Sequence, residues 1–88
     1  MSEPVYARMP GVVWRLGPDR VLVRRVDVPD GQPRDLQGSA ALVWISLDEP
    51  GTRAQVVERS SRAGLEIEPD DGIRLLLDEE LITASPAH

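Results

Sequence analysis

The segment VVWRLGPDRVLVRRV, residues 12–26, decides the first half of the fold. Apolar and polar residues alternate in its first part, and this places Val12, Trp14 and Leu16 on one face of a β-strand. Gly-Pro-Asp at residues 17–19 is a turn sequence, because proline presets φ and glycine tolerates unusual backbone angles. The segment therefore predicts a β-hairpin.

Two further signals extend this hairpin into a small sheet. Residues 20–28 are rich in β-branched side chains and predict the second hairpin strand, and Pro-Asp-Gly at residues 29–31 predicts another turn. A short third strand is expected over residues 33–37. Because Pro33 has no amide donor, this segment suits the edge of a sheet rather than its centre.

The pattern becomes helical after Gly38. A first helix is expected from an N-cap at Ser39 to about Asp48, where Pro50 and the glycine after it break the helix. Its apolar positions recur at helical spacing and predict a buried stripe. This stripe comprises Ala40, Val43, Trp44 and Leu47.

Two more helices follow. Thr52 and the glutamine three residues later form a capping-box pattern, which predicts a helix that ends near Gly64. A connector over residues 65–68 leads to Pro69, which suits the first position of a third helix that ends near residues 81–82. The side chains expected to turn inward from this helix are Ile73, Leu76 and Leu77.

Together these elements predict an α+β fold in which a three-stranded antiparallel sheet is followed by three helices, an arrangement typical of a winged helix-turn-helix. One domain is expected over residues 11–82. The polar, proline-containing ends, residues 1–10 and 83–88, are expected to be flexible. No stretch is long and apolar enough for a signal peptide or a membrane span, so a cytoplasmic protein without a membrane partner is expected.

The composition argues against catalysis and against cofactors. The 88 residues include no cysteine, and the one histidine is His88, so neither thiolate nor histidine metal sites are expected. The serines at 60–61 have no histidine near them to activate a nucleophile. Neighbouring acids such as Asp70 and Asp71 do not share a helix face, and there is no glycine-rich phosphate loop. A non-enzymatic protein that needs no cofactor is expected.

Charge is distributed unevenly along the chain. Residues 1–64 carry nine arginines and eight acids, whereas residues 65–88 carry one base, Arg74, and seven acids. In a winged helix the third helix would enter the DNA groove, where basic side chains must meet the phosphates. Its acidic character therefore predicts a protein that does not bind nucleic acid.

The hydrophobic spacing resembles that of the PqqD-like family, the recognition elements for ribosomally synthesised and modified precursor peptides. The resemblance rests on a leucine and a polar residue that end the third strand, a Val-Trp pair, a threonine that starts a helix, and spaced apolar residues in the last helix. The sequence departs from the family pattern at four places: the third strand lacks the aromatic residue often found just before its leucine, and Gln37, Gly72 and Glu80 replace the usual residues. The matching positions are Leu36-Gln37, Val43-Trp44, Thr52, Ile73, Leu76 and Leu81.

The resemblance implies a module that binds the leader region of a precursor peptide as an added β-strand. The leader would pair with the third strand, pack against the third helix, and be presented to a separate modifying enzyme or protease. Trp14 and Trp44 are expected to anchor the core, and Leu75 to be exposed without a role. The residues expected to bind the peptide are Arg34, Asp35, Leu36, Gln37, Ile73, Arg74 and Leu77.

Two other functions stay open at this point. A winged-helix transcriptional regulator would bind duplex DNA with salt-sensitive affinity, and a small protein–protein adaptor would co-purify with a protein partner. For the peptide-binding alternative, Leu36→Pro is expected to remove a backbone donor and weaken binding while largely sparing the fold.

Overall fold

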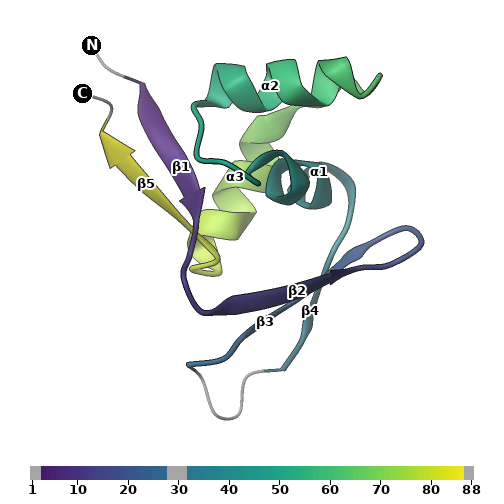
Figure 1. Ribbon diagram of the computed structural model, residues 1–88, viewed down its shortest axis with the longest axis vertical. Coiled ribbons are helices and arrows are strands. Elements are labelled where there is room, and N and C mark those ends of the chain that lie inside the picture. Colours follow the sequence, from purple (N-terminus) through teal and green to yellow (C-terminus); the bar gives the residue numbers. More distant parts are fainter. Residues whose placement is uncertain (1–2, 28–31, 87–88) are drawn as a thin grey trace.

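The computed structural model describes residues 3–27 and 32–86 of the chain. Three helices lie together over one side of a three-stranded sheet, and a separate two-stranded sheet lies beside them (Figure 1). The elements, in chain order, are β1 (Pro4–Arg8), β2 (Val12–Leu16), β3 (Val21–Arg25), β4 (Arg34–Leu36), α1 (Gly38–Ser46), α2 (Arg53–Arg62), α3 (Pro69–Asp78) and β5 (Ile82–Pro86).

The three-stranded sheet has the order β2-β3-β4 and is antiparallel throughout. Its hairpin turn is the predicted one, because the amide of Gly17 donates a 2.8 Å hydrogen bond to the carbonyl of Arg20. The third strand lies at the edge of the sheet, as its proline predicted. The turn predicted at residues 29–31 lies outside the described residues.

The two-stranded sheet corrects the prediction for the chain ends. β1 pairs antiparallel with β5 from Pro4 opposite Pro86 to Arg8 opposite Ile82, so these segments are not frayed. β1 also holds the turn between α1 and α2, since the backbones of Tyr6 and Gly51 exchange hydrogen bonds of 2.8 and 3.0 Å. Pairing over a long sequence separation gives no local signal, and the polar composition of the ends concealed it.

The helix boundaries agree with the sequence in part. The capping box at Thr52 is present, with Gln55 as its reciprocal partner. α1 instead begins at Gly38 with Gln37 as its N-cap, so Ser39 lies inside the helix and is not the predicted cap. α3 begins at Pro69 as predicted, but it ends at Asp78 and not near residues 81–82, because Ile82 already belongs to β5.

The core forms between the inner face of the three-stranded sheet and the three helices. Trp44 is fully buried, as predicted, whereas Trp14 is 42% exposed and is not the core anchor that was expected. The two indoles make an edge-to-face contact with centroids 6.3 Å apart. The buried apolar residues are Val21, Val23, Leu36, Ala40, Ala41, Val43, Trp44, Leu47, Val56, Ile73, Leu76, Leu81 and Ile82.

α1 and α3 approach each other most closely at Gly72. A Cβ atom at this position would lie 2.8 Å from the carbonyl carbon and oxygen of Ser39 and 2.9 Å from the amide nitrogen of Ala40. These are backbone atoms of α1, which cannot rotate away as a side chain would. Gly72 is therefore the residue that lets the two helix backbones touch.

Replacing Gly72 by alanine tests this contact. Alanine favours a helix over glycine by about 1 kcal/mol, but the added methyl group must push α1 and α3 apart, and overpacking of this kind costs about 1–3 kcal/mol. We expect a net loss of stability in urea unfolding. The exposed neighbour Asp71→Ala is the control and should change stability by less than about 0.5 kcal/mol. A Gly72→Ala variant as stable as the parent would contradict the close approach.

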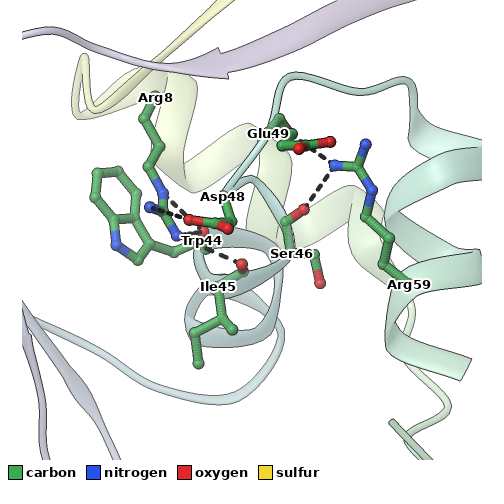
Figure 2. Close-up of polar contacts among 7 residues, drawn as sticks. All are labelled: Arg8, Trp44, Ile45, Ser46, Asp48, Glu49 and Arg59. Carbon is green, nitrogen blue, oxygen red and sulfur yellow. Dashed lines mark hydrogen bonds and ion pairs between the residues drawn. The ribbon is translucent and has the colours of Figure 1, made fainter. Parts of the chain in front are cut away.

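Arg8 of β1 closes the C-terminal end of α1 (Figure 2). Its guanidinium donates hydrogen bonds of 3.1 and 2.7 Å to the carbonyl of Trp44 and one of 3.4 Å to that of Ile45. It also lies 4.6 and 4.9 Å from the ring centroids of Trp14 and Trp44. Burial lowers the pKa of Arg8, and the carboxylate of Asp48 partly offsets this. The cation thus adds charged donors to two carbonyls of the last helical turn, which also accept backbone hydrogen bonds of 3.2 and 3.3 Å from the amides of Leu47 and Asp48.

Arg59 likewise binds backbone carbonyls in the turn that follows α1. It donates hydrogen bonds of 2.8, 2.6 and 3.2 Å to the carbonyls of Ser46, Glu49 and Pro50, as Figure 2 shows in part. A Cβ atom at Gly51 would lie 2.9 Å from a terminal nitrogen of Arg59. Two arginines from different elements therefore fix the α1–α2 turn.

Truncation of Arg8 should destabilise the whole domain. Hydrogen bonds to charged groups contribute about 1.5–3 kcal/mol each, so we expect Arg8→Ala to lower the free energy of unfolding by about 2 kcal/mol. Arg62, which makes only an exposed pair with Glu58 one helical turn away, provides the control. If Arg8→Ala and Arg62→Ala had equal and small effects in thermal melts, β1 would not hold α1 as described.

Candidate functional site

The direction of backbone groups along β3 can be derived from the hairpin. Arg20 and Val26, on either side of β3, are both hydrogen-bonded to the chain that forms β2. Because hydrogen-bonded and non-hydrogen-bonded positions alternate in an antiparallel pair, the even-numbered residues of β3 direct their backbone groups toward β2. Val21 and Val23 therefore direct theirs toward β4.

This alternation identifies the open backbone groups of β4. Val21 and Val23 are opposite Leu36 and Arg34, so those two residues direct their amides and carbonyls toward β3. Asp35, between them, directs its N–H and C=O toward the free edge of the sheet. Among the described residues, no strand pairs with this edge. Asp35 is thus the residue of β4 that could bond to an added strand.

Leu36 has a different role from the predicted one. Its backbone groups face β3, and its side chain is 2% exposed and packs in the core. The expectation that Leu36→Pro would remove an open donor and spare the fold is therefore wrong, because that change would break the sheet and leave a cavity. The edge donor to remove is that of Asp35.

α3 runs alongside β4 in the opposite direction. Near its start, Gly72 touches Ser39, which follows the end of β4 by three residues. Just after its end, the carboxylate of Glu79 lies 2.7 Å from the guanidinium of Arg34 at the start of β4. Figure 1 shows the same relation, with α3 behind α1 and β4 below it. The helix and the edge strand thus border one strip of surface.

A cavity of about 210 Å³ opens at one end of this strip. The side chains of Val23 and Leu81 are almost fully buried and form its apolar floor. Charged and polar side chains surround this floor, so the cavity combines an apolar base with a polar rim. Its lining consists of Val23, Arg24, Arg25, Gln32, Arg34, Glu79 and Leu81.

Two ion pairs join the end of α3 to the sheet at this cavity. Arg34 binds Glu79, and Arg25 binds Glu80, each at 2.7 Å. Hydrogen bonds to Asp27 and then to Glu80 raise the pKa of Arg25, and the same contact lowers the pKa of Asp27. Pairs this exposed contribute little energy and exchange partners readily.

The turn at the end of α3 places Glu80 in a left-handed backbone conformation. The amide of Leu81 bonds to the carbonyl of Leu76, and that of Glu80 bonds to the carbonyl of Leu77, which is the Schellman pattern. Glu80 has φ of 58°, a conformation that favours glycine. α2 ends in the same motif with Gly64 at the equivalent position.

Exchanging the residues at these two positions tests the turn. Glu80→Gly should raise stability by up to about 1 kcal/mol, because the left-handed strain costs about 1–2 kcal/mol and the lost ion pair is exposed. Gly64→Glu, the matched change in α2, should lower stability by about 1 kcal/mol. Thermal melts at equal protein concentration measure both. A Glu80→Gly variant less stable than Gly64→Glu would contradict this assignment.

Acid should weaken two exposed ion pairs, Arg25–Asp27 after β3 and Arg53–Asp70 between α2 and α3. The Arg25 contact holds the pKa of Asp27 below its ordinary value of 3.8, so ionisation of Asp27 favours the folded state. Arg53 lowers the pKa of Asp70 in the same way. Both contributions are complete above about pH 4 and are lost as the pH falls below it. In Asp27→Asn/Asp70→Asn, the free energy of unfolding should fall less steeply between pH 4 and pH 2; an unchanged slope would contradict these pairs.

The three α3 residues that the sequence predicted to bind the peptide lie on different sides of the helix. Ile73 is 5% exposed in the core, Leu77 is half-buried against the core, and Arg74 is exposed. Near the cavity, the segment that ends α3 contributes Glu79 and Leu81 instead. The peptide-binding role assigned to Ile73, Arg74 and Leu77 stays a prediction.

Leu75 is exposed, as predicted, and it lies on the side of α3 that is near β4. It lies three residues after Gly72 and four before Glu79, so the three share one stripe of the helix. Gly72 contacts the start of α1 and Glu79 contacts β4, so this stripe borders the edge strand. Leu75 is 44% exposed there. The position could have been recognised from the sequence only with the helix orientation in hand.

The described residues lack two other features, a metal-binding cluster and a membrane-spanning helix. In residues 3–27 and 32–86, no group of three or more His, Asp or Glu side chains is arranged to hold a metal ion. No helix within these ranges is long and apolar enough to cross a membrane. Comparisons with protein-family models, with curated proteins and with solved structures found no match for this chain.

Proposed function

We propose that this protein is a non-catalytic module that binds the leader region of a ribosomally synthesised precursor peptide and presents it to a separate modifying enzyme or protease. The observation that carries the proposal is the open edge of β4, bordered by α3 and by the apolar cavity at its end. The peptide adds a strand beside Asp35. In this proposal α2 and α3 are the two helices of a winged helix-turn-helix.

Backbone pairing alone would give weak binding. Asp35 offers one donor and one acceptor, and a net hydrogen bond contributes about 0.5–1.5 kcal/mol. Two such bonds fall well short of the roughly 8 kcal/mol that micromolar affinity requires. Most of the affinity must therefore come from peptide side chains that pack beside β4. Leu75 and the cavity over Val23 and Leu81 supply apolar surface for them.

The charges around this strip restrict the peptide. Asp71 and Asp78 lie one turn from Leu75 on the exposed side of α3. A leader that packs on Leu75 should therefore carry apolar side chains flanked by neutral or basic groups. The same acidic surface disfavours the alternative of a DNA-binding regulator, because α3 would face phosphates.

Asp35→Pro is the sharpest test, because proline removes the amide that faces the free edge. The probe is the N-terminal segment of a short precursor-like reading frame next to this gene, and calorimetry measures its affinity. We expect at least tenfold weaker binding for Asp35→Pro. Asp35→Ala keeps the amide and loses the Arg20 ion pair, so it should bind within about twofold of the parent.

Chemical shifts locate the binding surface independently. On addition of the probe, backbone amides of residues 34–37 and the exposed face of α3 should shift most. Shifts confined to β2, the other edge of the sheet, would contradict the assignment to β4. The absence of any neighbouring reading frame whose product binds, or salt-sensitive retention of duplex DNA in a gel shift, would overturn the proposal.

A further inference from the structure

α1 is apolar on all sides, although one side of the helix is exposed to solvent. Its nine residues, GSAALVWIS, include no charged side chain. Ala40, Ala41, Val43 and Trp44 face the core, yet Ile45 is 40% exposed and Leu42 is half-buried. A helix that is hydrophobic all round is normally covered on all sides. The outer side of α1 therefore needs a cover that the described chain does not provide.

Leu42 and Ile45 form a ridge along the exposed side of α1, and a hollow lies on each side of this ridge. One of about 320 Å³ separates Leu42 and Ile45 from the hairpin turn that follows Leu16. The other, of about 310 Å³, separates the same two residues from the end of α2 and Leu65. Leu16 is 65% exposed and Leu65 43%. We call Leu16, Leu42, Ile45 and Leu65 the α1 apolar face.

Carboxylates border this face. Asp48 and Glu49 line the second hollow, and the side chain of Asp48 is 88% exposed. The neighbouring Arg59 donates to three backbone carbonyls, and Arg20 beside the first hollow already binds Asp19 and Asp35. In the described part of the chain, Glu49 makes no ion pair. The acids are thus more available to a partner than the cations.

We infer that the α1 apolar face is the docking surface for a basic amphipathic helix of a partner protein. Apolar side chains of that helix would fill the hollows on either side of the Leu42–Ile45 ridge, as ridges fit grooves in helix packing. Its flanking lysines or arginines would meet Asp48 and Glu49. The surface is separate from the β4 edge, so this inference does not depend on peptide binding there.

The size of the face argues for this occupant rather than a second copy of the chain. Four apolar side chains, two of them on the nine-residue α1, are far fewer than the roughly 20–30 residues per partner in a stable interface. A short helix that inserts side chains into hollows suits such a surface, and its binding should be transient. The protein would thereby hold a partner while its sheet edge remains open.

A designed peptide can probe the face directly. We would use a synthetic amphipathic helix about 15 residues long, with leucines at helical spacing and arginines on both flanks, and a twin with glutamates in place of the arginines. Fluorescence anisotropy gives the affinities, and amide shifts give the location. Two serine variants provide the comparison: Ile45→Ser on this face and Val13→Ser, an exposed apolar residue of β2 outside both proposed binding surfaces.

The inference predicts binding of the arginine peptide with shifts at α1 and Leu65, at least tenfold weaker binding to Ile45→Ser, and less than twofold change for Val13→Ser. The glutamate twin should bind at least tenfold less tightly. Equal binding of both peptides, or equal effects of both serine variants, would overturn it. So would a dimer of the full chain in sedimentation that Ile45→Ser dissociates, because a second copy would then cover the face.

Discussion

The backbone contact between α3 at Gly72 and the start of α1 determines where the rest of the molecule lies. Because no Cβ separates them, α3 packs directly on Ser39 and Ala40, just beyond the end of β4. From that fixed point the helix runs back along the edge strand until Glu79 reaches Arg34. A bulkier residue at position 72 would move α3 away from α1. The surface strip between helix and strand therefore depends on one missing methyl group.

Arginines then fix the elements that this contact positions. Arg8 and Arg59 bind the carbonyls at and after the end of α1, while Arg25 and Arg34 form ion pairs with the turn after α3. A planar guanidinium with several donors suits such multiple contacts better than a lysine ammonium would. The near-neutral charge balance of residues 1–64 is accompanied by pairing with the acidic last part of the chain, because Arg25, Arg34 and Arg53 form ion pairs with acids of residues 70–80. It gives no indication of a nucleic-acid partner.

Much of the architecture could be predicted from local signals. The turn at residues 17–19, the capping box at Thr52 and Pro69 at the start of α3 were correct because each acts within a few residues. The sheet of β1 and β5 could not be predicted, since its strands are short and lie at opposite ends of the sequence. Trp14 was misjudged because strand alternation gives the face of a side chain but not how much of it the helices cover.

The sequence predicted which segment forms the candidate site, but not which backbone groups of that segment face outward. Residues 34–37 mark the edge strand, but which backbone groups face outward depends on the register against β3, and Asp35 emerges only from that pairing. The importance of Leu75 similarly follows from the orientation of α3, which the contacts of Gly72 and Glu79 establish. Sequence spacing alone favoured Ile73 and Leu77, because inward-facing apolar residues give the stronger periodic signal.

The measurement that tests the account most directly is an isotope-filtered NMR experiment on labelled protein with the unlabelled leader segment. If the peptide adds a strand to β4, cross-strand nuclear Overhauser effects should connect its backbone protons with those of Asp35, and its side chains should give effects to the methyl groups of Leu75. Contacts from the peptide to β2 or to the α1 apolar face, with none to Asp35, would contradict the central claim.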